Sequence, residues 1–109
     1  MVTNSIQTPP ELEPLLALIK ARLNPRAIWL FGSRARGDAR DSSDWDLLIG
    51  LPDEAVEDGV DPMTAWELQK AAGISATIVG ARMADLAETW TVPNTLAFEV
   101  AREGRLLDV

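Results

Sequence analysis

The sequence predicts an α/β (α+β) domain in which helices pack mainly on one face of a small mixed sheet. Two apolar runs with the character of buried strands, residues 27–31 and 45–51, flank a polar segment, and helical patterns lie on either side of them. With 109 residues, 47% of them hydrophobic, the chain has enough apolar surface for one core. We therefore expect a single domain over residues 1–109, with residues 1–7 flexible.

Composition narrows the possible chemistry and the possible partners. The chain contains no cysteine and no histidine, which excludes disulfides, thiolate metal sites and imidazole catalysis. Its net charge of −7 opposes binding to nucleic-acid phosphates and suits a basic protein partner instead. No apolar run approaches the roughly 20 residues of a membrane helix, and Met1–Gln7 lacks a signal-peptide pattern. We expect a cytoplasmic protein that binds neither membranes nor nucleic acids directly.

An amphipathic helix is expected before the first strand. Thr8 can serve as its N-cap, with Glu11 completing a capping box. Because a proline inside a helix removes a hydrogen bond, the helix can instead begin at Glu13-Pro14. Asn24-Pro25 ends it in either case. Its apolar residues fall on one stripe that would cover a face of the sheet, namely Leu12, Leu15, Leu16, Ile19 and Leu23.

The polar segment between the two strands carries a pair of acidic residues. Because side chains alternate between the faces of a strand, Asp44 and Asp46 project from one face, roughly 6 to 7 Å apart along the chain. Trp45 between them points to the opposite face, as a core residue would. Two neighbouring carboxylates repel each other unless a cation neutralises them, and Mg²⁺ binds one or two carboxylates together with substrate phosphates. The pair is therefore a candidate magnesium site.

The same segment offers donors for phosphate groups. Gly32 allows close approach of the backbone, Ser33 adds a hydroxyl group, and a helical turn starting at Ser33 would direct its dipole at an anion. Arg34, Arg36 and Arg40 are three of the ten basic residues. Each feature alone is common in turns or on solvated surfaces. Their order and spacing between two strands favour a nucleoside triphosphate bound with Mg²⁺.

An acidic loop follows the second strand. Residues 53–61 are too polar for a core, and such a run is most simply solvated surface. The alternative is that Glu54, Glu57 or Asp58 contributes a carboxylate to the metal site.

The rest of the chain is expected to alternate helices and strands. The expected elements are a helix from Asp61-Pro62 to Ala72 ended by Gly73, a strand at Ile74–Val79, a helix at Met83–Trp90, a helix begun by Pro93-Asn94 and ended by Gly104, and an edge strand at Arg105–Val109. Leu96, Val100 and either Ala97 or Ala101 would form the inner stripe of the last helix. Whether Trp66 and Leu68 face inward or toward a partner is left open.

Gly32-Ser33, followed after ten residues by Asp44-x-Asp46, resembles the signature of the DNA polymerase beta-type nucleotidyltransferase superfamily. The similarity is greatest to its minimal members, the MNT-domain (MntA-like) antitoxins. It is strong over residues 27–49 and weaker over residues 71–79 and 99–107. The resemblance implies the minimal nucleotidyltransferase fold, with the triphosphate on the Gly-Ser turn and the metal on the two aspartates.

One position departs from the pattern of this superfamily. Relatives commonly carry a third catalytic aspartate in the strand after the helix-ending glycine, and aligning residues 76–79 on that pattern puts Thr77 in its place. Threonine supplies neither a charge nor a base near neutral pH. Catalysis would therefore depend on two carboxylates alone, or on a replacement from the acidic loop.

The resemblance implies an adenylyltransferase that moves AMP from ATP, with Mg²⁺, to a hydroxyl of a HEPN-type toxin, in particular a tyrosine hydroxyl. The implied residues are Asp44 and Asp46 as catalytic and metal-binding groups, and Gly32, Ser33, Arg34 and Arg36 as nucleotide-binding groups. The implied assembly is a hetero-oligomer of antitoxin and toxin.

Two other functions remain open at this point. A catalytically degenerate antitoxin would neutralise its partner by binding alone, with Trp66 and Trp90 as candidate interface anchors. Transfer to a small molecule such as an aminoglycoside is the other, although enzymes of that kind generally use a second domain to bind the acceptor.

Overall fold

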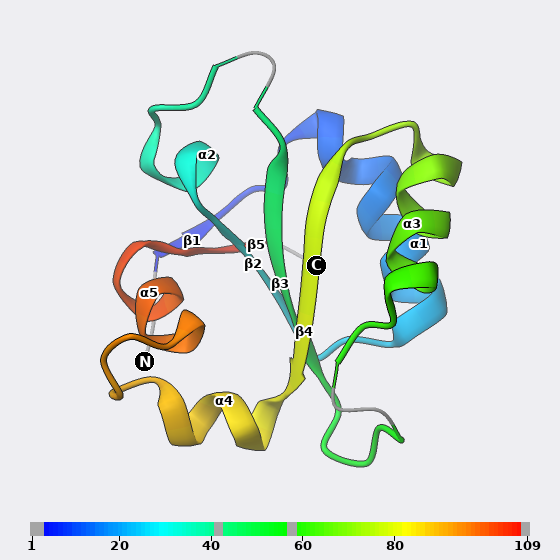
Figure 1. Cartoon of the computed structure of the whole chain (residues 1–109). Helices are drawn as coiled ribbons and strands as arrows, with labels where there is room; N and C mark the ends of the chain where they lie inside the picture. The colour runs from blue at the N-terminus through cyan, green and yellow to red at the C-terminus, as the bar shows by residue number, and fades with distance from the viewer. Residues whose placement is uncertain (1–3, 41–42, 57–58, 108–109) are drawn as a thin grey trace.

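The computed structural model describes residues 4–40, 43–56 and 59–107 and contains one mixed five-stranded sheet (Figure 1). Its strands lie in the order β1 (Asn4–Ile6), β5 (Arg105–Leu107), β2 (Ala27–Phe31), β3 (Trp45–Leu51) and β4 (Ala76–Arg82). The helices are α1 (Glu13–Leu23), α2 (Ser33–Arg36), α3 (Pro62–Ala72), α4 (Met83–Thr89) and α5 (Leu96–Glu103), and a 3-10 turn, η1 (Pro10–Leu12), precedes α1. The central strand β2 is antiparallel to both of its neighbours, whereas β3 pairs with β4 in parallel.

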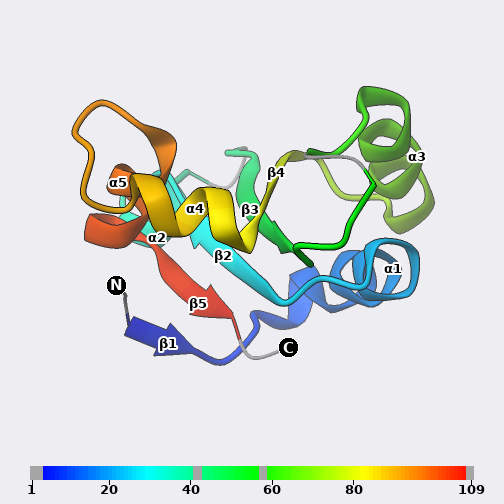
Figure 2. The same cartoon turned by 90° about the horizontal axis from the view of Figure 1, so that it is seen from below.

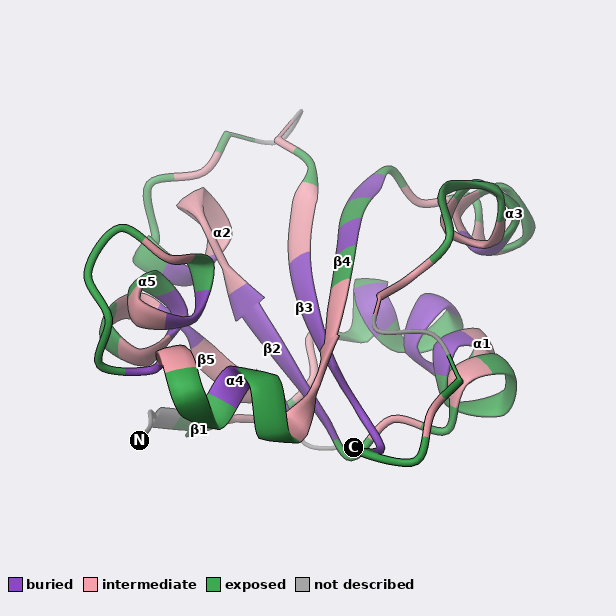
Figure 3. Cartoon of the chain, turned by 60° about the horizontal axis from the view of Figure 1, so that its bottom comes forward, coloured by how far each residue is buried: buried purple, intermediate pink, exposed green. Residues whose placement is uncertain are grey.

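The two faces of the sheet bury separate hydrophobic clusters (Figure 2). The two longest helices, α1 and α3, cover one face, where Leu15 and Ile19 pack with alternate residues of β2 and β3 such as Ile28 and Leu47. On the other face α4 and α5 cover Trp29 and Leu48 with residues such as Val100. The predicted mixed α+β fold is confirmed. The sequence placed the helices mainly on one face, whereas in the structure α4 and α5 cover the second face as well. Figure 3 shows the resulting band of buried residues along β2 and β3.

No helix within the described ranges is long and apolar enough to span a membrane.

The N-terminal segment differs from the prediction in two respects. Asn4–Ile6, expected to be flexible, pairs in parallel with Arg105–Leu107. Thr8 is not the N-cap of the first turn; Pro9 takes that position, and the α-helix begins at Glu13, which was the second of the two expected starts. The helix ends as predicted, with Asn24 in the left-handed conformation at a φ of 49°.

Two element boundaries and the position of one strand in the second half of the chain also differ from the prediction. The strand expected at Ile74–Val79 instead runs from Ala76 to Arg82. The last helix begins at Leu96, because the hydroxyl of Thr95 accepts a hydrogen bond from Phe98 N and caps it there. Leu96 itself is exposed, whereas Ala97 and Val100 form the predicted inner stripe. The strand expected at the edge is an inner one, since β5 lies between β1 and β2.

The two tryptophans named as candidate interface anchors differ clearly in exposure. Trp90 is only 7% exposed and packs edge-on against Trp29, with ring centroids 5.3 Å apart. Trp66 is 55% exposed and lies beneath the ammonium group of Lys70. Leu68 faces the core, which answers the question that the sequence left open for α3.

Replacing Trp90 by alanine and replacing Trp66 by alanine are expected to have very different effects on stability. Trp90→Ala opens a cavity against Trp29 and should lower the free energy of unfolding by about 3–5 kcal/mol. Trp66→Ala removes an exposed ring with one cation–π contact and should cost at most about 1 kcal/mol. Urea denaturation measures both values, and equal losses would contradict this assignment.

Candidate active site

The sheet brings Gly32, Asp46 and Thr77 to one end of three adjacent strands. Phe31, the last residue of β2, pairs with Asp46, and Asp46 pairs in turn with Thr77 of β4. A Cβ atom on Gly32 would overlap Oδ2 of Asp46, so the carboxylate lies directly against this glycine. Its φ of 73° is a second reason why residue 32 must be glycine. The turn and the second aspartate of the motif, far apart in the chain, are therefore in contact.

The turn continues directly into α2. Gly32 is the N-cap of this short helix, and its carbonyl accepts hydrogen bonds from the backbone N–H groups of Ala35 and Arg36, both at 3.1 Å. Ser33 occupies the first helical position, where backbone N–H groups have no partner within the helix and can bind an anion. The predicted helical turn from Ser33 is confirmed, beside the Asp46 carboxylate.

Asp44 and Asp46 flank Trp45 at the start of β3. Trp45 packs against the cluster under α1 and α3, as predicted for the residue between them. By strand alternation Asp46 lies on the opposite face, where it is half-buried, and Asp44 just before the strand is exposed. No group of three or more acidic, histidine or cysteine side chains gathers anywhere in the described parts of the chain. Two carboxylates suit Mg²⁺ when phosphate and water oxygens complete its coordination.

Thr77 stands where a third carboxylate would complete the group. It is exposed and in register with Asp46 on the neighbouring strand. The sequence alignment that singled out this residue therefore corresponds to a real spatial neighbour of the aspartate pair.

The acidic loop lies too far away to replace the missing acid. β3 is seven residues long, with Asp46 second from its start, and the loop leaves the strand at its other end (Figure 1). There Glu54 pairs with Arg26 at 3.4 Å, and Asp53 accepts a hydrogen bond from Ala84 N. The proposed contribution of Glu54 to the metal site is wrong. Glu57 and Asp58 lie outside the described residues.

Arg34 holds the polar loop in place. Its Nε and Nη2 atoms donate to the carbonyl of Ser43 at 3.1 and 2.8 Å, and its guanidinium lies over the Trp45 ring, 4.1 Å from the centroid. The same group reaches the Arg40 carbonyl at 3.5 Å. These contacts fix the backbone immediately before Asp44. Sequence reasoning expected Arg34 to bind nucleotide and missed this positioning role.

Arg36 points into a different environment from Arg34. It pairs with Asp38 at 3.3 Å and with Glu103 of α5 at 3.6 Å. The hydrogen bond and charge of Asp38 raise the pKa of Arg36 above its ordinary value.

Loss of the Arg34 contacts is expected to loosen the loop before Asp44. Arg34→Gln should increase the rate of tryptic cleavage after Arg40 and weaken binding of Mg²⁺-ATP several-fold, because Ser43 loses both donors. Arg34→Lys keeps the charge but cannot form the two-pronged contact or stack on Trp45, so it should behave like Arg34→Gln. Full recovery in the lysine variant would show that charge alone matters.

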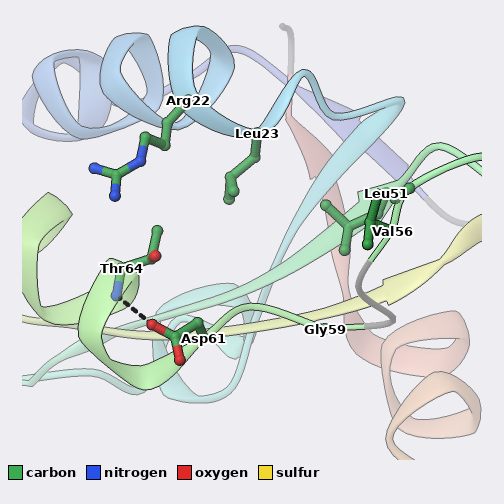
Figure 4. Close-up of a pocket in the computed structure, with 8 residues that line it drawn as sticks. Arg22, Leu23, Leu51, Val56, Gly59, Asp61 and Thr64 are labelled. Atoms are coloured by element: carbon green, nitrogen blue, oxygen red, sulfur yellow. Dashed lines mark hydrogen bonds between the residues drawn. The ribbon is translucent and has the colours of Figure 1, made fainter.

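A hollow at the opposite end of the sheet does not carry this chemistry (Figure 4). It lies between the end of α1 and the start of α3, with a volume of about 270 Å³. Arg22 and Asp61 are its charged residues, and Asp61 already accepts a hydrogen bond from Thr64 N at 3.1 Å, drawn dashed in Figure 4. Neither Asp44 nor Asp46 lines it.

The sequence matches the family model described as "Polymerase beta, Nucleotidyltransferase" over residues 13–108. No curated protein and no solved structure matches the chain significantly.

Proposed function

Because the chain belongs to the polymerase beta-type nucleotidyltransferase family, we propose that it transfers AMP from ATP to a tyrosine hydroxyl of a HEPN-type toxin protein. Family membership supports nucleotidyl transfer in general. The observation that supports the proposal further is the contact between the Asp46 carboxylate and Gly32, because it lies where a proposed metal ligand would meet the proposed phosphate-binding turn. The nucleotide, the acceptor and the partner come from the similarity to MNT-domain antitoxins.

In this proposal the residues of the turn bind and orient the triphosphate. The Ser33 hydroxyl and the backbone N–H groups at the start of α2 donate to the β- and γ-phosphates. Asp44 and Asp46 hold Mg²⁺, which when bound offsets the charge that develops on the transferred phosphoryl group. The acceptor oxygen attacks the α-phosphorus in line, the bond to the β-phosphate oxygen breaks, and pyrophosphate leaves. Most of the rate enhancement then comes from positioning.

The charge of the chain supports a basic protein as acceptor. A net charge of −7 steers association with a partner of opposite sign and opposes binding of nucleic acids. We propose a hetero-oligomer of the two proteins in the cytoplasm.

The second candidate is an antitoxin that acts by binding alone. The observation that favours it is the threonine beside Asp46, where relatives commonly have an acid. Of its two candidate anchors, Trp66 is exposed enough to contact a partner, whereas Trp90 is buried against Trp29.

One experiment separates the two candidates. The protein is incubated with Mg²⁺, ATP and the product of its neighbouring gene, and the neighbour is then weighed by mass spectrometry. Catalysis predicts a mass increase of one or more AMP units that requires Asp44 and Asp46. A neighbour that is bound and inactivated without any gain in mass supports binding alone and contradicts transfer.

Adding the missing acid is expected to strengthen the site. Thr77→Asp puts a third carboxylate beside Asp46 and should raise the affinity for Mg²⁺ several-fold, and the rate of transfer with it. Val79→Asp is the matched control, since it adds the same charge two residues along the same face of β4, beside Leu48. Titration with Mg²⁺ in the presence of ATP measures the affinity of both variants for Mg²⁺. Equal effects would show that the position of the added carboxylate is unimportant.

A further inference from the structure

A second hollow lies near the turn but outside the site described above. It is formed by α2, the end of α5 and the start of β5, which lie on the same side of the molecule in Figures 1 and 2. Its volume is about 520 Å³, within the range of small-molecule sites. Its wall includes Arg36, Arg102 and Arg105 together with Glu103. Of the residues predicted to bind nucleotide or metal, Arg36 lines it, whereas Gly32, Ser33, Arg34 and the two aspartates of the motif do not.

The charge of this hollow is opposite to that of the chain. The protein has 10 basic and 17 acidic residues, yet here three arginines from three elements surround a single carboxylate. Glu103 lies 3.6 Å from Arg36 and 4.0 Å from Arg102, and Asp38 outside the wall pairs with Arg36 at 3.3 Å, so two carboxylates offset part of the charge of three arginines. Arg105 forms no ion pair or side-chain hydrogen bond with any described residue. A positive excess therefore faces the hollow.

A tight turn in the backbone brings these arginines together. At Gly104 a Cβ atom would come within 2.6 Å of the Val100 carbonyl oxygen, so only glycine lets the chain pass so close to the last turn of α5. The chain enters β5 at once, and Arg102 and Arg105 reach the same hollow from either side of the turn.

We propose that this hollow binds an oligophosphate anion at a position separate from the Gly32–Ser33 turn. Guanidinium groups present paired N–H donors that match phosphate oxygens, and three of them converging on one hollow can hold more than one phosphate group. A mostly apolar pocket would favour a neutral ligand, whereas this wall is chiefly charged. The oligophosphate can be free pyrophosphate or the phosphate chain of a nucleotide.

Isothermal titration with pyrophosphate in the absence of Mg²⁺ tests the proposal. The wild-type protein is expected to bind pyrophosphate, and Arg102→Gln with Arg105→Gln should weaken binding at least about tenfold, the loss expected for two charge-assisted contacts. Arg22→Gln is the matched control, because it removes one arginine from the hollow of Figure 4 and should leave binding unchanged. Equal weakening in the control, or no binding by the wild type, overturns the proposal.

Two further arms separate this site from the nucleotide site and identify the ligand. Ser33→Ala removes the hydroxyl proposed to bind phosphate at the turn and should keep pyrophosphate binding, because Ser33 does not line this hollow, and loss of binding there would contradict a separate site. Competition by Mg²⁺-free ATP identifies the phosphate chain of a nucleotide as a ligand, whereas binding of pyrophosphate without competition identifies the free anion. Melting temperatures of all variants establish that each is folded. These outcomes do not depend on whether AMP transfer occurs.

Discussion

Asp46→Asn is expected to lower the rate of nucleotidyl transfer at least about 100-fold while leaving the fold intact. The amide has the same shape as the carboxylate, so its contact with Gly32 remains. It carries no charge, however, and cannot hold a divalent cation beside a triphosphate as a carboxylate does. A metal that stabilises the transition state contributes several kcal/mol, and each 1.36 kcal/mol is a factor of about ten in rate. Transfer of AMP to the partner at saturating ATP measures the effect.

The control for this variant changes the same charge at the other end of β3. Asp53→Asn leaves an oxygen that can still accept the hydrogen bond from Ala84 N, and it should keep full activity. If Asp46→Asn kept the full rate, as Asp53→Asn should, the carboxylate would have no part in the chemistry.

Gly32→Ala is expected to remove both binding of Mg²⁺-ATP and a large part of the stability. The substitution forces a Cβ atom onto Oδ2 of Asp46 and keeps an L-residue at a φ of 73°. With a ψ of −157°, this backbone conformation is essentially confined to glycine and costs about 1–3 kcal/mol for a residue with a Cβ atom. The displaced carboxylate adds to that cost and can no longer face the turn. Urea denaturation and the shift of melting temperature by Mg²⁺-ATP measure the two effects separately.

Gly37→Ala is a matched control for this substitution. Gly37 has a φ of 83°, but nothing lies within 4 Å of a Cβ atom placed there. The Gly37→Ala variant should therefore lose only about 1–2 kcal/mol of stability, the cost of left-handed backbone, and should keep binding of Mg²⁺-ATP. Equal losses at the two positions would mean that the close approach of Asp46 to residue 32 has no consequence.

Local chemistry made much of the fold predictable. Asp61 caps α3 and Gly73 ends it because these signals lie next to the helix that they limit. The long apolar runs identified β2 and β3 correctly, and with them the polar segment that holds Gly32 and Asp46. The register between these strands then brings Gly32 next to Asp46, since Phe31, the residue before Gly32, lies opposite Asp46.

Features that depend on distant partners could not be predicted in the same way. β1 is three residues long, too short for a periodic pattern. The strand at β5 was predicted, but its pairing with β1, which joins the two ends of the chain, was not. The distance of Glu54 from the aspartates follows only from the direction and length of β3. The role of Arg34 depends on a side chain folding back onto a carbonyl nine residues away.

Calorimetric titration with ATP, with and without Mg²⁺, tests most directly whether Asp44, Asp46 and the Gly32–Ser33 turn form one magnesium–nucleotide site. The site predicts that the wild-type protein binds ATP much more tightly when Mg²⁺ is present than when it is absent. It also predicts that Asp44→Asn with Asp46→Asn removes this dependence on Mg²⁺ together with most of the affinity. ATP binding of equal strength in the wild type and the double variant, with Mg²⁺ present, would contradict it.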